Sequence, residues 1–195
     1  MKPFSQACEN NKTPILAQLK TFFADRKCVL EIGSGTGQHA VYFGEHLPQL
    51  QWQCGDLSEN HEGIQAWLNE AQLPNVLAPL VLDAEASEWQ LEQFDAVYSA
   101  NTLHIMSWPQ VEMTFKHIGK VLAEGGKLAV YGPFNYQGKF TSESNARFDQ
   151  WLKQEAPHRG IRDFEAVNKL AENIGLKLVA DHAMPANNRL LFWQR

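Results

Sequence analysis

The chain has 195 residues and a formal net charge of −5, and 44% of its residues are hydrophobic while 20% are charged. This length suffices for one domain with a substantial core, and the composition is that of a globular protein without extended disorder. The acidic balance argues against nucleic acid as a partner, because neutralising phosphates requires a basic face. We therefore expect a single domain over residues 1–195.

The cysteines and histidines predict neither a disulfide framework nor a metal site. Cys8, Cys28 and Cys54 are far apart and form no Cys-x-x-Cys pair, as in proteins with reduced thiols. His39 and His46 share a predicted helix face but have no third ligand nearby in the sequence, so we expect no metal. The N-terminus lacks the apolar core of a signal peptide and no run reaches membrane-spanning length, so we expect a cytoplasmic protein with no membrane contact.

An N-terminal helical arm is expected over residues 1–28. Apolar residues between Thr13 and Phe23 recur at helical spacing and predict a helix that lies against a sheet. The polar residues before it, Glu9 to Lys12, form either a surface arm or a flap over a ligand, and Asn11 is their best candidate contact.

Next comes a glycine-rich run, Val29–Gln38, which predicts a buried strand, a tight loop and the start of a helix. Its pattern Glu-x-Gly-x-Gly-x-Gly lacks both the sixth-position glycine of the dinucleotide fingerprint and the Gly-Lys-Ser/Thr of a phosphate-binding loop. Glycines let the backbone turn sharply and approach a ligand closely, and a helix start offers unpaired N–H groups. The loop either only packs or binds a small polar ligand, through the candidates Glu31, Gly33, Ser34, Gly35 and Gly37.

Two more strands are predicted, Gln51–Asp56 and Val76–Leu82. The first ends in Asp56, and the second is followed by Asp83. Asp56 comes nineteen residues after Gly37, where an acid in a nucleotide-binding unit meets ribose hydroxyls. Alternatively, Asp56 is a solvated strand end and Asp83 caps the following turn. The candidate ligand contacts here are Asp56, Leu57, Asp83 and Ala84.

A fourth strand, Phe94–Ala100, leads into Asn101 and His104. Ligands of an open α/β sheet bind outside the carboxyl ends of its strands, so both side chains should face the ligand. A neutral imidazole offers one donor and one acceptor, so His104 is a general base, a residue that orients substrate, or a structural histidine.

The regular alternation ends after a fifth strand, Lys127–Tyr131, and we expect an inserted substrate lid over residues 133–160. Two last strands, Leu176–His182 and Arg189–Trp193, are separated by six residues and predict an antiparallel hairpin at the sheet edge. Arg162 could bind an acidic or polar substrate or form a surface ion pair. The candidate substrate contacts are Asn11, His104, Phe134, Tyr136, Phe140, Arg162 and Asn187.

The loop from Glu31 to Gly37, together with Asp56 and Asp83, resembles the class I S-adenosylmethionine-dependent methyltransferases. The order of elements is similar over nearly the whole chain, which implies a Rossmann-like α/β fold. Such a fold has a mostly parallel seven-stranded sheet, helices on both faces and an antiparallel C-terminal hairpin. The motifs Ser-Gly-Thr-Gly-Gln-His, Tyr-Gly-Pro-Phe and Met-Pro-Ala-Asn-Asn resemble those of a small methyltransferase-like family found in bacteria and animals.

The resemblance implies S-adenosylmethionine as cofactor, S-adenosylhomocysteine as product and a small-molecule methyl acceptor. It places the methionine part of the cofactor on the glycine loop, its ribose at Asp56 and its adenine amino group at Asp83. His104 is then the best catalytic base, with Tyr131 and Tyr136 in reserve. One rival is a nucleic-acid methyltransferase, although Ser99–His104 lacks the Asn/Asp-Pro-Pro-aromatic motif of amino-group methylation. The other is a non-catalytic interaction protein with the same fold.

Overall fold

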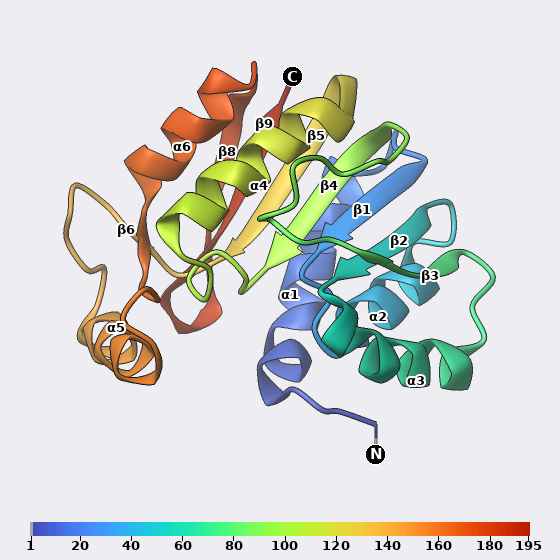
Figure 1. Cartoon of the computed structure of the whole chain (residues 1–195), viewed down its shortest axis with the longest axis horizontal. Coiled ribbons are helices and arrows are strands. Elements are labelled where there is room, and N and C mark those ends of the chain that lie inside the picture. Colours follow the sequence, from blue (N-terminus) through green and yellow to red (C-terminus); the bar gives the residue numbers. More distant parts are fainter. Residues whose placement is uncertain (1) are drawn as a thin grey trace.

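A seven-stranded sheet in the order β3-β2-β1-β4-β5-β9-β8 forms the centre of the computed structural model, which describes residues 2–195 (Figure 1). The strands from β3 to β5 are parallel, and β9 runs antiparallel to both of its neighbours. The predicted mostly parallel sheet with a C-terminal hairpin is therefore confirmed. Its strands are β1 (Cys28–Ile32), β2 (Gln51–Asp56), β3 (Val76–Val81), β4 (Phe94–Ala100), β5 (Leu122–Gly132), β8 (Lys177–Met184) and β9 (Asn188–Gln194).

Helices cover both faces of the sheet. The main ones are α1 (Gln6–Phe22), α2 (Gln38–His46), α3 (His61–Ala71), α4 (Trp108–Val121), α5 (Glu143–Glu155) and α6 (Phe164–Asn173), with short 3-10 turns η1 (Ser58–Asn60) and η2 (Pro185–Asn187). Residues of α1, α2 and α3 belong to the apolar cluster on one face, and residues of α4 and α6 to the cluster on the other. A small second sheet pairs β6 (Phe134–Asn135) with β7 (Arg162–Asp163).

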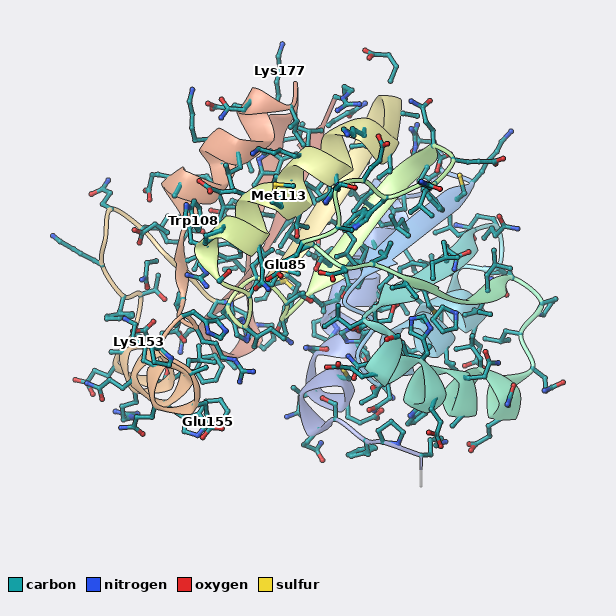
Figure 2. The ribbon with its side chains drawn as sticks, viewed as in Figure 1. Glu85, Trp108, Met113, Lys153, Glu155 and Lys177 are labelled. Carbon is teal, nitrogen blue, oxygen red and sulfur yellow. The ribbon has the colours of Figure 1, made fainter. Side chains whose placement is uncertain are left out.

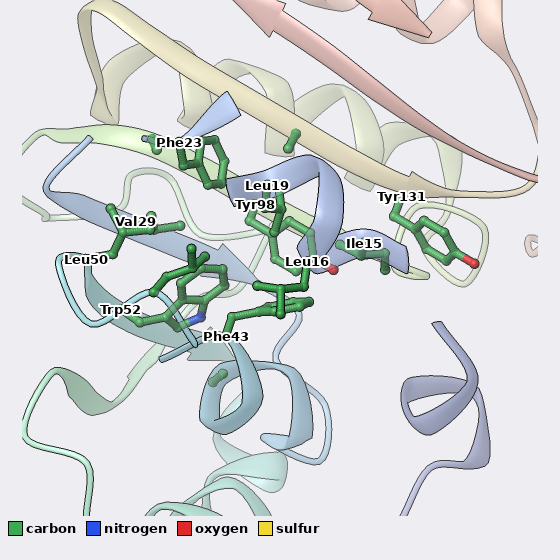
Figure 3. Packing of buried hydrophobic residues seen from close by; sticks show 14 of the residues in the cluster. Ile15, Leu16, Leu19, Phe23, Val29, Phe43, Leu50, Trp52, Tyr98 and Tyr131 are labelled. Atoms are coloured by element: carbon green, nitrogen blue, oxygen red, sulfur yellow. The ribbon is translucent and has the colours of Figure 1, made fainter. Parts of the chain in front are cut away.

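Aromatic side chains fill the core beneath α1 and α2. The rings of Phe43 and Tyr98 meet edge to face with centroids 5.5 Å apart, and Trp52 lies beside both (Figure 3). Trp52 and Tyr98 are fully buried, and close aromatic packing of this kind is among the largest contributions to a core. This core packs α1 and α2 against the face of the sheet that β1, β2 and β4 form.

The first helix is longer than the sequence predicts. Its start is capped by Ser5, whose side chain accepts a hydrogen bond from the Cys8 N–H at 3.3 Å, the usual role of serine at this position. The polar residues Glu9 to Lys12 are therefore helical rather than a loose arm.

Pro79 lies within β3, an edge strand, where a residue without a backbone N–H is tolerated.

The carboxyl ends of the parallel strands point toward the side of the molecule on which α5 lies (Figure 1). In Figure 2, Lys153 and Glu155 mark α5, which lies beyond the edge of the sheet. Trp108 and Met113 mark α4, which lies on a face of the sheet. The loops that follow β1, β2, β3, β4 and β5 therefore face a space that α5 helps to enclose. Among residues 2–195, no helix is both long and apolar enough to cross a membrane.

Candidate functional site

A cavity of about 910 Å³ opens at the carboxyl ends of the parallel strands. Its walls come from the glycine loop after β1, the ends of β2, β3 and β4, the N-terminal half of α1, the start of α5 and the β8–β9 turn. Small-molecule sites commonly occupy about 300–1,000 Å³ at this edge of an α/β sheet. The cavity is therefore large enough for a nucleoside-sized ligand and a second small molecule.

The glycine loop approaches the cavity with its backbone. Gly33 has φ +76°, and a Cβ built on it would lie 2.4 Å from Oγ1 of Thr102, so no other residue fits there without a shift. A Cβ built on Gly35 would meet no atom within 4 Å. Because Gly35 also lines the cavity, the space above the loop is open to a ligand.

Asp56, at the end of β2, is joined directly to this loop. Its Oδ2 accepts a hydrogen bond from the Gly35 N–H at 2.6 Å, and its Oδ1 accepts from the Leu57 N–H and from Asn60 Nδ2, each at 2.7 Å. A carboxylate offers about four acceptor positions, so these three bonds leave about one for a ligand. Asp56 is thus not the solvated strand end that the sequence left open, since it is buried beside the cavity.

Asp83 caps a turn, as one of the two sequence interpretations expected, and it also lines the cavity. Its Oδ1 accepts a hydrogen bond from the Glu85 N–H at 2.8 Å, and its backbone oxygen accepts one from Nε1 of Trp89 at 2.8 Å. Trp89 in turn stacks on His117 with ring centroids 4.6 Å apart. Among residues 2–195, no hydrogen bond engages Asp83 Oδ2, which leaves an acceptor for a ligand amino group.

Asn101 turns the chain at the end of β4. Its φ of +56° lies in the left-handed region, which asparagine tolerates better than most residues. Its backbone N–H donates to the backbone oxygen of Tyr131 at 2.9 Å. The next residue, Thr102, is buried and covers Gly33. The turn therefore closes the floor of the cavity between the glycine loop and the end of β5.

The N-terminal half of α1 forms part of the cavity wall because α2 holds it in place. Gln38, the first residue of α2, accepts a hydrogen bond from the Ser5 N–H at 2.5 Å and donates through Nε2 to Glu9 at 2.9 Å. Deeper in, Asn11 Oδ1 lies 2.6 Å from Nε2 of His39. Burial lowers the pKa of His39 to about 4, so its ring is neutral at neutral pH and Nε2–H donates to Asn11.

Glu31 supports the loop from below and does not line the cavity. Its Oε2 accepts hydrogen bonds from Ser34 Oγ at 2.9 Å and from Trp52 Nε1 at 3.1 Å. Burial raises its pKa to about 7, against the effect of these two donors. Glu31, which the sequence predicted as a ligand contact, therefore shapes the loop from outside the cavity lining.

His104 faces the cavity from the loop after β4 and meets the ring of Phe148 on α5 edge to face, at 5.3 Å. Burial lowers its pKa to about 4, and the positive charges of Arg162 and Arg159 lower it further. No side-chain hydrogen bond holds its ring within residues 2–195. A neutral imidazole with lone-pair and N–H available thus projects into the cavity.

The structure brings together most, but not all, of the predicted site residues. Those that line the cavity are Asn11, Gly33, Ser34, Gly35, Asp56, Leu57, Asp83, Ala84, Asn101, His104 and Tyr131. Those that the structure places elsewhere are Glu31, Gly37, Phe134, Tyr136, Phe140, Arg162 and Asn187.

Most of the displaced residues have another structural role, whereas Phe140 is exposed. The hydroxyl of Tyr136 donates to Asp181 at 2.8 Å, Phe134 is buried in the core and Phe140 is 43% exposed. A Cβ on Gly37 would meet the backbone of Ile64 at 3.1 Å, so Gly37 lets α2 and α3 approach. Asn187 Nδ2 donates to Ser144 Oγ at 3.1 Å.

Arg162 is neither a surface ion pair nor a cavity residue. Its guanidinium donates to the backbone oxygens of Leu103, Met106 and His158. It therefore holds the loop that carries His104 against the segment before β7.

Several cavity residues were not predicted from the sequence. They come from α1, from α2, from the start of α5 and from the segment after it, and include Cys8, His39, Asn145, Phe148, His158 and Arg159. His39 and Asn145 are buried polar residues, but burial at these positions depends on how α1 and α5 dock, which no local pattern reveals. Within residues 2–195, no group of three or more His, Cys, Asp or Glu side chains is placed to hold a metal ion.

Solved structures share this fold. An O-methyltransferase family protein from Burkholderia thailandensis superposes with a TM-score of 0.83 at 18% identity, covering 94% of this chain and 56% of that one. An O-methyltransferase family 2 protein from Planctomyces limnophilus, in complex with apigenin, gives 0.76 at 14% identity, with 94% and 61% coverage. Human N-acetylserotonin methyltransferase, in complex with S-adenosylmethionine, gives 0.80 at 13% identity, with 97% and 53% coverage.

The chain thus spans only 53–61% of the length of these three structures. What it shares with them is the fold, and the expectation of a class I methyltransferase fold is confirmed. A family model described as "Protein of unknown function (DUF938)" matches residues 2–195, and the chain belongs to that family.

Proposed function

We propose that this protein is an S-adenosylmethionine-dependent methyltransferase that acts on a small-molecule acceptor. The observation that carries the proposal is the direct bond between the Gly35 N–H and Asp56 Oδ2 at the rim of one large cavity. It couples a backbone surface without side chains to a carboxylate, which is the combination that an amino-acid and ribose-bearing ligand requires.

The residues present fit such a cofactor. The open space above Gly35 would take its methionine part, the remaining acceptor position of Asp56 would take a ribose hydroxyl, and Asp83 Oδ2 would take the adenine amino group. Leu57, 40% exposed at the cavity rim, would cover one adenine face. When bound, the cofactor supplies an electrophilic methyl group on a sulfonium.

The remaining cavity residues suit the handling of an acceptor. Positioning an acceptor in line with a reacting carbon can by itself supply a large part of a rate enhancement. His104 and Phe148 lie on the α5 side of the cavity, and Tyr131 lies at the end of β5. The neutral ring of His104 can take the proton of an acceptor hydroxyl on a ring nitrogen. Of the two other histidines that line the cavity, His39 is hydrogen-bonded to Asn11 and His158 is exposed.

A small acceptor fits better than a nucleic acid because the chain carries a net charge of −5. The test is incubation of the protein with methyl-labelled S-adenosylmethionine and a fractionated extract of small metabolites. We expect S-adenosylhomocysteine to form and label to enter at least one metabolite of low mass. Label entering RNA or DNA instead would contradict the small-molecule acceptor, and cofactor binding without transfer to any fraction would favour a non-catalytic protein.

A further inference from the structure

One cation in the cavity, Arg159, has no side-chain partner among the residues that the structure describes. Arg159 lines the cavity, and its buried Nε makes no hydrogen bond within residues 2–195. None of the ion pairs in this part of the chain includes Arg159. A buried donor left unpaired costs about 1–3 kcal/mol, more when it is charged, so the unpaired Nε of Arg159 indicates a missing acceptor.

The segment that carries Arg159 is held firmly in place. The neighbouring Gly160 N–H donates to the backbone oxygen of His104 at 3.0 Å, and the Ile161 N–H donates to Asp149 Oδ1 at 2.8 Å. A Cβ on Gly160 would lie 2.9 Å from Asp149 Oδ1, so the backbone approaches α5 closely. Arg159 is therefore presented from a rigid support beside the loop of His104.

The charges around this end of the cavity are unbalanced toward the positive. Asp149, a buried acid that contacts this segment, already binds Lys153 Nζ at 2.6 Å. Arg162 donates only to backbone oxygens. Asp56, Glu59 and Asp83, the carboxylates that line the cavity, belong to the opposite end, around the glycine loop, η1 and β3.

We propose that the methyl acceptor carries a carboxylate and that Arg159 binds this group. This inference rests on the proposed function, because it treats the α5 end of the cavity as the acceptor site. The planar guanidinium matches a carboxylate with two parallel hydrogen bonds. A single unpaired arginine balances a monoanion, whereas a phosphate dianion would call for a further cation. Phe148 and Met106 supply apolar walls for the rest of the acceptor.

The proposal can be tested with a matched pair of probes, benzoate and benzamide, which differ in charge but hardly in shape. We expect benzoate to bind the complex with S-adenosylhomocysteine more tightly than benzamide, as measured by calorimetry. In the variant Arg159→Gln, benzoate affinity should fall by about tenfold or more, since a hydrogen bond to a charged group is lost, while benzamide affinity stays unchanged. Arg147→Gln is the control, because Arg147 lies on α5 outside the cavity lining and its side chain is 71% exposed.

Three results would overturn the proposal: no benzoate binding to the wild-type protein, equal affinity for both probes, or benzoate affinity unaffected by Arg159→Gln. Tighter binding of phenyl phosphate than of benzoate would also contradict a carboxylate. S-Adenosylhomocysteine affinity is measured on the same samples, and unchanged affinity in Arg159→Gln shows an intact fold. If that ligand fails to bind the wild-type protein, the methyltransferase proposal fails, whereas its binding together with one of the results above removes only the acceptor class.

Discussion

Asn11 on α1 and His39 on α2 form a buried hydrogen bond of 2.6 Å beside the cavity. The ring of His39 is neutral at neutral pH, and its Nδ1 lies 3.4 Å from the Tyr98 hydroxyl, which can donate to it. A chain of three side chains thus connects the N-terminal helix to the centre of β4. This chain of side chains holds α1, whose first turns are polar, in place beside the cavity.

Removing Asn11 should loosen this helix. In Asn11→Ala the buried His39 Nε2–H loses its acceptor, so we expect the free energy of unfolding to fall by about 1–3 kcal/mol, measured by denaturant titration. Asn10→Ala is the control, because Asn10 is exposed and its side chain pairs with Gln6 at the surface, so its loss should cost less than about 0.5 kcal/mol. Equal losses in the two variants would contradict the role given to the Asn11–His39 pair.

The contact between Gly33 and Thr102 predicts a large effect of one methyl group. Gly33→Ala places a Cβ 2.4 Å from Thr102 Oγ1, so overpacking of about 1–3 kcal/mol adds to the cost of the left-handed backbone. Gly125→Ala is the matched control: its φ is +70°, but a Cβ there meets nothing within 4 Å. The difference in stability between the two variants measures the packing cost, and no difference would contradict a tight loop.

Acid should destabilise the protein through its buried histidines. Burial lowers the pKa values of His39 and His104 from 6.5 to about 4, so the unfolded chain binds protons more readily than the folded one between these values. Their contribution to stability is complete above pH 6.5 and is lost as the pH falls toward 4, up to about 3 kcal/mol for each.

The variant His39→Gln isolates this effect, because it keeps a donor toward Asn11 and removes one titrating group. Glu31, whose raised pKa of about 7 gives the opposite dependence between pH 4.5 and 7, is present in both proteins and cancels from the difference. Unfolding by denaturant at pH 7 and at pH 5 should show a smaller loss in the variant. Parallel losses would contradict a neutral, buried His39.

His104 should affect turnover more than cofactor binding. Once the acceptor is identified, His104→Ala is expected to lower kcat by about 10²–10⁴ if the ring accepts the acceptor's proton, with little change in cofactor affinity. Because the pKa of His104 is about 4, the rate should show no step from this group between pH 6 and 8. An unchanged kcat in the variant would remove His104 from the reaction.

The glycine loop, Asp56 and the sheet could be predicted from the sequence because each depends on local pattern. A buried strand, a glycine turn and a helix follow one another within residues 29–47, and the next strand ends in an acid. These elements depend on residues that are close together in the sequence, and the βαβ arrangement leaves little freedom in where their ends meet.

The acceptor side of the cavity could not be predicted in the same way. Tyr136 and Phe140 follow β5 closely, as lid residues would, yet Tyr136 stacks on Phe164 and bonds to Asp181 on β8, while Phe140 is exposed. Phe148 and Arg159 reach the cavity only because α5 docks beside the loop of His104. Such docking rests on long-range contacts, including the bonds of Arg162 to three backbone oxygens, and no periodicity within α5 encodes it.

The most direct test of the account is calorimetric titration of S-adenosylmethionine into the wild-type protein, Asp56→Asn and Asp95→Asn. Asp95 is the matched control, because its carboxylate also accepts two backbone N–H bonds, from Lys27 and Cys28, but at the opposite end of the strands. We predict binding to the wild type, affinity at least about tenfold weaker in Asp56→Asn, and unchanged affinity in Asp95→Asn. No binding to the wild type, or equal affinity with and without the Asp56 carboxylate, would contradict a cofactor site built on Gly35 and Asp56.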